Sequence, residues 1–305
     1  MQELVFLINP HAGKGRSSAL LREAERSVLG INLRAIEPKN AEDLTRICAE
    51  LDPAQTKAAV VLGGDGTQHF AIRGLSSSGV PLYPYPAGTA NDLASEHGIR
   101  HDWSQFQRLI AGGNTQEMDL LSVNDIPFAT VAGIGIGSNL TEEFNHLRSR
   151  SPLFKKLSQR MSSEMYTLLS VKNILGNWGQ SLQLRIHADC YHEKINTAAM
   201  FVCNQSSLGG VLRVAPEISN RDKRFSVLIL PYSRGFSMLR ALTQMRMGIL
   251  SESFISFSTD HLEVSSLTGE ALQVFGDGEP LLKNSHLEFK IFPQKLNIYS
   301  EEGSA

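Results

Sequence analysis

Three glycine-containing segments of the sequence have the residue types and the spacing of a phosphate-binding site. They are INPHAGKGRSS (8–18), LGGDGTQ (62–68) and PAGTANDLAS (86–95), and each joins an apolar run to a helical pattern. Glycines let backbone amides approach a phosphate closely, and the N-terminus of a helix attracts anions through its dipole. The segments match neither a Walker loop nor the G-x-G-x-x-G pattern of a dinucleotide loop. A different cradle for a nucleotide phosphate is therefore expected.

Each of these segments, taken alone, also fits an ordinary turn between a strand and a helix. Asp65 and Asp92 fit the N-cap position of a helix, where a side chain accepts bonds from backbone amides. Lys14 and Arg16 fit either a solvated surface or contacts with the β- and γ-phosphates. Three such segments at one edge of a parallel sheet favour a ligand site, because ligands bind at the carboxyl ends of the strands.

A fourth segment, FGDGEPL (275–281), places a carboxylate beside a tight turn. Asp277 suits the role of a base that takes the proton of an attacking hydroxyl group. Glu279 follows two residues later and is expected to orient groups or ions nearby. Asp-Gly between apolar strands is also a strong β-hairpin signal, so a purely structural turn is the alternative.

The patterns that position these segments change near residue 120. Residues 1–120 alternate short apolar runs with helical patterns, which is typical of βαβ units and a parallel sheet. Residues 121–290 contain many β-like segments, interrupted by helical patterns at 154–175 and 234–248, and predict an antiparallel sandwich. We therefore expect an α/β domain followed by a β-rich domain, with a tail of about 290–305 packing back on the first.

The composition limits the classes of function. The chain has 305 residues with a net charge of −2 and a pI near 6.5, which argues against nucleic-acid binding and against membrane binding by charge alone. Cys48, Cys190 and Cys203 form no C-x-x-C pair, so we expect reduced core thiols in a cytoplasmic protein. The sequence has no signal-peptide pattern and no apolar run long enough to span a membrane.

In this order, the four segments resemble the diacylglycerol kinase catalytic-domain family, which includes bacterial lipid kinases and the sphingosine and ceramide kinases. The residues that carry the resemblance are NPHAGKG (9–15), GGDGT (63–67), PAGTANDLA (86–94) and GDGEPL (276–281). CNQSSLGGVLRVAPEISNRD (203–222) is similar to a further segment of the family, so the resemblance spans nearly the whole chain. GGDGT alone is shared with NAD kinases and related phosphofructokinase-like folds.

The resemblance implies a phosphofructokinase- and NAD-kinase-like α/β domain that holds ATP, and a β-rich domain facing it across a cleft that admits lipid. The residues implied at the nucleotide are Asn9, Lys14, Gly63, Gly64, Asp65, Gly66, Thr67, Gly88 and Thr89. The carboxylates implied around Mg²⁺ are Asp65, Asp92 and Asp119, and those implied in catalysis are Asp277 and Glu279. Mg²⁺ prefers oxygen ligands and needs only one or two carboxylates beside phosphates and water, so this set is chemically suitable.

Two places depart from the family pattern. In GIGIGS (133–138), Gly137 and Ser138 stand where the family usually has Asp and Ala. That Asp commonly faces the lipid head group in sphingosine kinases, so the departure disfavours sphingosine. In NRDKRFSVLIL (220–230), Asp222 keeps the first position of a structural magnesium loop found in some bacterial relatives, although the glycine that follows it there is absent.

The expected function is transfer of the γ-phosphate of ATP, with Mg²⁺, to a hydroxyl group of a membrane lipid, diacylglycerol or a related lipid. Two alternatives are an NAD kinase, which shares GGDGT, and an inactive lipid- or nucleotide-binding regulator, indicated by the changes at Gly137 and after Asp222. The expected location is the cytoplasm with transient membrane contact. The expected partner is lipid at the membrane surface, with a second copy of the chain as a further candidate and no nucleic acid.

Overall fold

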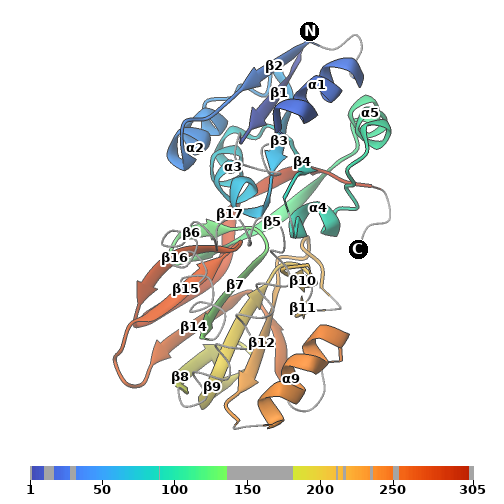
Figure 1. Ribbon diagram of the computed structural model, residues 1–305. Helices are drawn as coiled ribbons and strands as arrows, with labels where there is room; N and C mark the ends of the chain where they lie inside the picture. Colours follow the sequence, from blue (N-terminus) through green and yellow to red (C-terminus); the bar gives the residue numbers. More distant parts are fainter. Residues whose placement is uncertain are drawn as a thin grey trace, which may run out of the picture. The chain divides into compact units, whose positions relative to one another are not determined.

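The chain forms two compact units. The structure is a computed structural model that describes residues 2–9, 17–27, 32–88, 90–135, 181–210, 212–215, 218–233, 236–249 and 254–301 (Figure 1). Unit 1 comprises Met1–Leu120 together with Phe292–Ala305, and unit 2 comprises Leu121–Ile291. Unit 1 is therefore built from two separate stretches of sequence, whereas unit 2 is one continuous stretch.

Unit 1 is built on a parallel sheet. Its elements are β1 (Glu3–Ile8), α1 (Ser17–Ser27), β2 (Leu33–Ile36), α2 (Ala41–Ala49), β3 (Thr56–Gly63), α3 (Asp65–Ser78), β4 (Leu82–Pro86), α4 (Asp92–Glu96), α5 (Trp103–Gly112), and parts of β5 (Thr115–Val123) and β17 (His286–Tyr299). The strand order is β17-β4-β3-β1-β2, and each neighbouring pair is parallel. β1 and β3 are almost wholly buried, which is the pattern of parallel strands covered on both faces.

Both faces of this sheet are covered. On one face, Leu20 of α1 and Phe106 of α5 pack in one cluster with Phe6 of β1. Val5 and Leu7 alternate with Phe6 along β1 and are also fully buried, so the opposite face is covered as well. Figure 1 shows α2 and α3 side by side, and they pack so closely that a Cβ on a glycine of α3 would clash with the α2 backbone.

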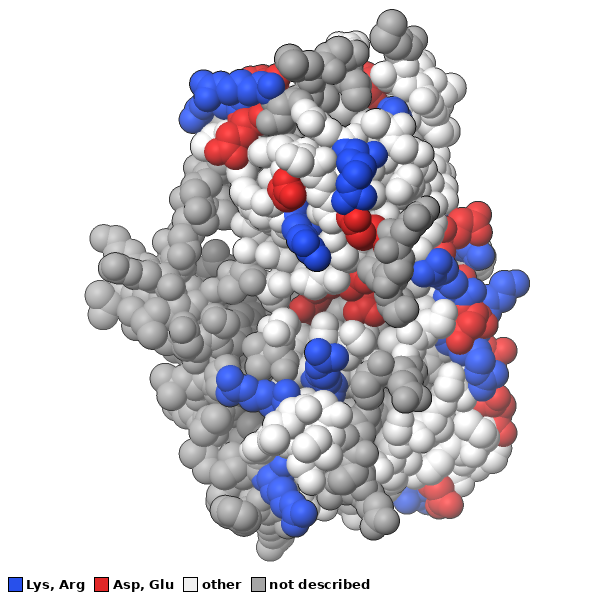
Figure 2. Space-filling view, turned by 90° about the vertical axis from the view of Figure 1, so that its right-hand side faces the viewer, with Lys and Arg blue, Asp and Glu red and all other residues white. Residues whose placement is uncertain are grey.

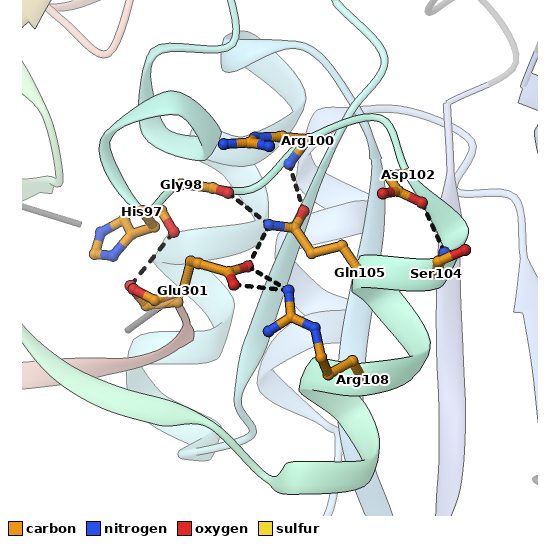
Figure 3. A network of polar contacts seen from close by, with 9 residues as sticks. His97, Gly98, Arg100, Asp102, Ser104, Gln105, Arg108 and Glu301 are labelled. Carbon is orange, nitrogen blue, oxygen red and sulfur yellow. Dashed lines mark hydrogen bonds and ion pairs between the residues drawn. The ribbon is translucent and has the colours of Figure 1, made fainter. Parts of the chain in front are cut away.

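The end of β17 is attached to α5 by a polar network (Figure 3). Glu301 accepts a hydrogen bond from Gln105, and its Oε1 lies 2.6 Å from Nη2 of Arg108. Gln105 also donates to Gly98 O at 2.7 Å and accepts from Arg100 N at 2.8 Å. Hydrogen bonds from Gln105 and Arg108 hold the pKa of Glu301 below its usual value, so its carboxylate is charged in this network. The tail is thus tied to unit 1 beyond its strand pairing.

Unit 2 is rich in antiparallel strands. Its elements are the rest of β5 and β17, with β6 (Ile126–Phe128), β7 (Val131–Gly135), β8 (Leu182–Ala188), β9 (His192–Cys203), β10 (Ser207–Leu208), β11 (Leu212–Arg213), β12 (Phe225–Pro231), α9 (Phe236–Met247), β13 (Ile255–Thr259), β14 (His261–Ser266), β15 (Leu272–Gly276) and β16 (Glu279–Asn284). The strand order is β16-β15-β7-β9-β8-β14-β17, with β12 between β9 and β13. The pairs among β7 to β9 and β12 to β16 are antiparallel.

The second half of β9, a central strand of unit 2, is buried on both of its faces. In β9, Met200 and Val202 enter one hydrophobic cluster, whereas Phe201 and Cys203 enter another on the opposite face. This alternation is the period of two expected of a strand. α9 packs into the second cluster, and its bounds confirm the helical pattern at 234–248. The helical pattern at 154–175 lies outside the described residues.

The predicted fold class is confirmed, with an α/β unit on a parallel sheet followed by a β-rich antiparallel unit. None of the described helices is long and apolar enough to cross a membrane. Acidic and basic side chains are interspersed over the face shown in Figure 2, in keeping with the net charge of −2.

The cysteines are not all in the core. Cys48 and Cys203 are buried, and burial raises the pKa of the Cys48 thiol to about 12. Cys190 is exposed, so the prediction of three core cysteines is wrong at this position. It lies in the short turn that joins β8 to β9, where Ala188 and Tyr191 close the hairpin, and it belongs to neither hydrophobic cluster.

Candidate functional site

The loop after β3 leads directly into the N-terminus of α3. β3 ends at Gly63 and α3 begins at Asp65, with Gly64 between them as an N-cap that makes no side-chain capping bond. The first backbone amides of a helix have no acceptor within the helix. The amide of Gly66, in the first turn of α3, is therefore a donor suited to an anionic ligand such as a phosphate.

Asp65 joins this loop to the loop after β4. Its Oδ2 accepts a hydrogen bond from Asn91 N at 3.0 Å, and its Oδ1 accepts one from Asp92 N at 2.7 Å. Bonds from backbone amides to a carboxylate are stronger than neutral ones, so they fix the two loops firmly. A carboxylate has about four acceptor positions in all, so these two bonds are compatible with Asp65 also acting as an oxygen ligand of a metal ion.

The loop after β4 is shaped by Asn91. Asn91 has a left-handed backbone with φ of 52°, which asparagine tolerates better than most residues. Its Oδ1 accepts a hydrogen bond from Gly88 N at 2.8 Å, and its Nδ2 donates to Gly88 O at 3.2 Å. A Cβ on Gly88 would clash with the Cα of Gly64, so glycine is needed where the two loops touch.

The loop after β1 belongs to the same assembly. Nδ2 of Asn9 donates to Oγ1 of Thr67 at 2.9 Å, which links the end of β1 to the first turn of α3. The structure thus brings together Asn9, Gly64, Asp65, Thr67 and Gly88, from three loops far apart in sequence. Parallel strands end at one edge of a sheet, which is why these loops meet.

Two further carboxylates of unit 1 are buried. Asp92 begins α4, and its amide bonds to Asp65, so these two predicted metal ligands are neighbours. Asp119 lies in β5, with its Oδ1 3.8 Å from Nζ of Lys295, and Lys295 also pairs with Glu117 at 3.0 Å. The hydrogen bond that Lys295 donates to Glu117, reinforced by the charges of Glu117 and Asp119, raises the pKa of Lys295. Asp119 therefore has a cation beside it that the sequence pattern did not predict.

The donor set fits Mg²⁺ held only partly by protein. Among the residues that the structure describes, no group of three or more His, Cys, Asp or Glu side chains is placed to hold a metal ion. Mg²⁺ keeps several waters and binds through one or two carboxylates beside substrate phosphates, so a protein cage is not required. Asp65 and Asp92 have the oxygen chemistry for such a site, and the backbone amide of Asp92 lies 2.7 Å from Oδ1 of Asp65.

Asp277 of unit 2 lies in a hairpin turn but is not an ordinary turn residue. Asp277 and Gly278 connect β15 to β16 and have φ of 52° and 82°, both positive as in a type I′ hairpin turn. The side chain is only 4% exposed, although turn aspartates normally face water. The structural alternative is therefore correct for the backbone, and it does not account for the buried carboxylate.

Hydrogen bonds from the start of β7 compensate for the burial of this carboxylate. Oδ1 of Asp277 accepts bonds from Thr130 Oγ1 at 2.6 Å, Thr130 N at 2.7 Å and Ala129 N at 3.1 Å. Oδ2 shares the amide of Ala129, also at 3.1 Å. On the other side of this segment, Asn204 donates to Ala129 O at 2.8 Å. The carboxylate is thus held in one orientation, with Oδ1 as its anchored oxygen.

The remaining predicted sites of unit 2 differ from Asp277. Glu279 begins β16 and is half-buried. Asp222 is exposed in a turn, where its Oδ1 accepts a hydrogen bond from Arg224 N at 3.1 Å. Lys223 has φ of 57°, so the left-handed backbone that suits glycine is kept at the position where the family's glycine is missing. Asp222 belongs to unit 2, whereas the other predicted metal ligands, Asp65, Asp92 and Asp119, belong to unit 1.

Some predicted positions lie outside the described residues, namely Lys14, Thr89, Gly137 and Ser138. Conversely, the structure adds positions that were not singled out from the sequence. They are Asn91, Thr130, Asn204 and Lys295, which support a predicted carboxylate or its loop. Asn91 was the easiest of them to predict from the sequence, because an asparagine between a glycine turn and a helix often has a left-handed backbone. A threonine inside an apolar strand pattern carried no comparable signal.

Comparisons with known proteins find relatives that match most of this chain. A diacylglycerol kinase of Mycobacterium tuberculosis (strain ATCC 25618 / H37Rv) is 25% identical over 290 residues, covering 91% of this chain and 88% of the relative. A diacylglycerol kinase of Bacillus subtilis (strain 168) is 25% identical over 288 residues, covering 92% and 90%.

Solved structures show the same fold. The crystal structure of a diacylglycerol kinase from Bacillus anthracis str. Sterne superposes with a TM-score of 0.70 at 15% identity, covering 100% of this chain and 98% of that one. An NAD kinase from Archaeoglobus fulgidus, solved in complex with ATP, superposes with a TM-score of 0.52 at 10% identity, covering 100% and 95%.

Family profiles account for both units. Residues 3–123 match the diacylglycerol kinase catalytic domain, and residues 152–300 match the YegS C-terminal NAD kinase beta sandwich-like domain. With both domains present in the order and with the site loops described above, the chain belongs to the diacylglycerol kinase catalytic-domain family.

Proposed function

We propose that this protein is an ATP- and Mg²⁺-dependent lipid kinase that phosphorylates a hydroxyl group of a membrane lipid, diacylglycerol or a close relative. Membership of the family and the names of the relatives support the class of reaction. The observation that carries the proposal is the burial of Asp277 with four hydrogen bonds to its carboxylate. A turn needs no such carboxylate, whereas transfer to an alcohol does.

In unit 1, the loops after β1, β3 and β4 hold the phosphates of the nucleotide. The amides at the start of α3 and the glycines of the two touching loops serve as donors, joined by Asn9, Lys14, Thr67 and Thr89. Asp65 keeps the loops in place, and together with Asp92 and Asp119 it supplies the carboxylate oxygens of the metal site. Bound Mg²⁺ supplies charge neutralisation on the transferred phosphoryl group.

In unit 2, Asp277 takes the proton of the lipid hydroxyl group as the hydroxyl oxygen bonds to the γ-phosphorus of ATP. The bond between the γ-phosphorus and its bridging oxygen breaks, and ADP leaves. Because Oδ1 accepts three bonds, we assign the proton to Oδ2. Thr130 is a positioning residue, since its hydroxyl and amide both hold Oδ1. Glu279 orients groups near the turn. Asp222 belongs to a structural magnesium loop and takes no part in phosphoryl transfer.

The test is a phosphorylation assay on the purified protein. The protein is incubated with γ-labelled ATP, Mg²⁺ and a panel of lipids in mixed micelles, and with NAD in a parallel sample. Label that is extracted into organic solvent with diacylglycerol or a related lipid, and is lost when Mg²⁺ is chelated, is the expected result. The extracted product also identifies the acceptor.

Other outcomes contradict the proposal in distinct ways. Label on NAD would make the protein an NAD kinase, an activity found on the same fold. ATP binding without label on any acceptor would make it a lipid- or nucleotide-binding regulator.

A further inference from the structure

The C-terminal end of α9 displays two large apolar side chains. Among the residues that the structure describes, the large hydrophobic side chains that are exposed are Met247 at 67%, Ile249 at 48% and Leu267 at 39%. Scattered apolar residues are normal on a protein surface. Met247 and Ile249, however, both lie at the C-terminal end of α9, and we call this helix end with its two exposed apolar side chains the α9 tip.

Backbone hydrogen bonds close the C-terminal end of α9. Ile249 N donates to Gln244 O at 2.9 Å and Gly248 N donates to Met245 O at 3.1 Å, which is the bonding pattern of a Schellman cap. Gly248 has the left-handed φ of 71° that this cap requires, and it lies against the side-chain stem of Arg213. The apolar pair is therefore presented by an ordered helix end.

The other face of α9 anchors the tip to the sheet that carries Asp277. Ala241 and Met245 are buried in the same hydrophobic cluster as Val131 of β7 and Phe275 of β15. Val131 follows Thr130 directly, and Phe275 lies two residues before Asp277. Figure 1 shows α9 beside β12, whose residues also join this cluster. A contact made by the α9 tip is thus made by the same packed body as the proposed base.

Among the described residues of α9 and of β11 beside it, the charged side chains are all basic. α9 contains no acidic residue, and its Arg240 and Arg246 are exposed. Arg213 of β11, against which Gly248 packs, is exposed as well. Apolar side chains flanked by arginines are the combination by which a helix end enters the headgroup region of an anionic bilayer. A stable protein–protein interface buries about 1,000 Å² or more, so the two apolar side chains of the α9 tip are too small an area for a stable protein partner.

We propose that the α9 tip, with Arg213, Arg240 and Arg246, is the surface by which this protein contacts a membrane containing anionic lipids. Met247 and Ile249 insert among the headgroups, and the three arginines pair with lipid phosphates. The purpose of this contact rests on the proposed lipid kinase function, but the contact itself is independent of catalysis.

The first experiment measures sedimentation of the full chain with vesicles of phosphatidylcholine alone and with about one-third phosphatidylglycerol. Wild type is expected to bind the anionic vesicles and to lose binding at high salt. The double variant Met247→Ser/Ile249→Ser is expected to lower the partition coefficient about tenfold. Leu267→Ser is the matched control, because it removes an exposed apolar side chain elsewhere and is expected to bind as wild type does.

The second experiment tests the arginines. Arg240→Gln/Arg246→Gln is expected to lower binding to anionic vesicles about fivefold for each charge removed. Arg26→Gln/Arg73→Gln removes the same charge from exposed positions of unit 1 and serves as the control. Thermal melting of every variant establishes that the fold is kept, since all of these side chains are exposed.

Three results would overturn the proposal. They are absence of vesicle binding by wild type, equal losses in the test and control variants, and a concentration-dependent dimer that the Met247→Ser/Ile249→Ser variant abolishes. Binding at the α9 tip without phosphorylation of any lipid would reject the proposed function alone. Lipid phosphorylation in micelles with vesicle binding insensitive to the α9 tip would reject this inference alone.

Discussion

Asp65 of unit 1 and Asp277 of unit 2 are both aspartates in glycine-rich turns, and they are bonded differently. Asp65 uses one oxygen for each of two amides in a neighbouring loop, at 3.0 and 2.7 Å, and is half-buried. Asp277 accepts three hydrogen bonds at one oxygen, Oδ1, and is 4% exposed. The first carboxylate connects two pieces of backbone, whereas the second is itself the group that is held.

This difference matches the two roles in the proposed function. In unit 1 the proposed phosphate donors are the backbone amides of the loops, and the aspartate keeps those amides in place. In unit 2 the backbone keeps an aspartate in place, and the proposed base is its side chain. The same short motif, aspartate followed by glycine, would therefore mark a binding site in one unit and a reactive group in the other.

The largest effect is expected for Asp277→Asn. The amide keeps the shape and the hydrogen bonds to Oδ1 but cannot take a proton, so kcat is expected to fall about 10²–10⁴-fold. ATP affinity, measured by titration calorimetry, should stay at the wild-type value because the residues proposed to hold the nucleotide are in unit 1. An Asp277→Asn protein that turns over at the wild-type rate would remove this residue from the role of base.

A smaller effect is expected for Asp65→Asn, and it falls on stability and ATP affinity. The new NH₂ group faces a backbone amide, so one bond is lost and two donors oppose each other. The free energy of unfolding is expected to fall by about 1–3 kcal/mol, and the Kd for ATP to rise. Denaturant melts and calorimetry measure both quantities.

Asp52→Asn is the matched control for Asp65, because Asp52 is an exposed carboxylate that also accepts a backbone amide, from Ala54 at 2.9 Å. If the two variants lose the same stability and both keep wild-type ATP affinity, Asp65 does not organise the nucleotide loops.

The smallest effect is expected for Thr130→Val, which keeps the amide bond to Asp277 and removes only the hydroxyl donor. One bond to a charged group corresponds to a fall in kcat of about tenfold, with the KM for ATP unchanged. Thr130→Ser keeps the hydroxyl and should restore the rate. Equal losses in both variants would mean that Thr130 serves packing and does not orient the carboxylate.

Much of this molecule could be predicted from the sequence. Buried runs such as LVFLI and AAVVL, followed by glycine turns and helical patterns, predicted the parallel sheet and the edge at which Asn9, Asp65 and Gly88 meet. The hairpin at Asp277 could also be predicted, since Asp-Gly between apolar strands favours a turn with positive φ. These features depend on residues close together in the chain.

What could not be predicted depends on contacts across long separations. The hydrogen bond between Thr130 and Asp277 joins residues 147 positions apart, and the sequence of neither segment indicates this contact. Lys295 beside Asp119 is a similar case, because the proximity follows from the return of β17 to unit 1. The exposure of Cys190 depends on the hairpin between β8 and β9, which composition alone does not indicate.

The return of β17 has a consequence for how the protein is made on the ribosome. Unit 1 needs residues 292–301, which pair with β4 and fasten to α5 through Glu301, yet these residues are synthesised after the whole of unit 2. Domains generally fold as units during synthesis, with the earlier one first. Here unit 2, which is one continuous stretch, can finish folding first. Unit 1 stays incomplete, with the edge of β4 unpaired, until translation reaches the end of β17.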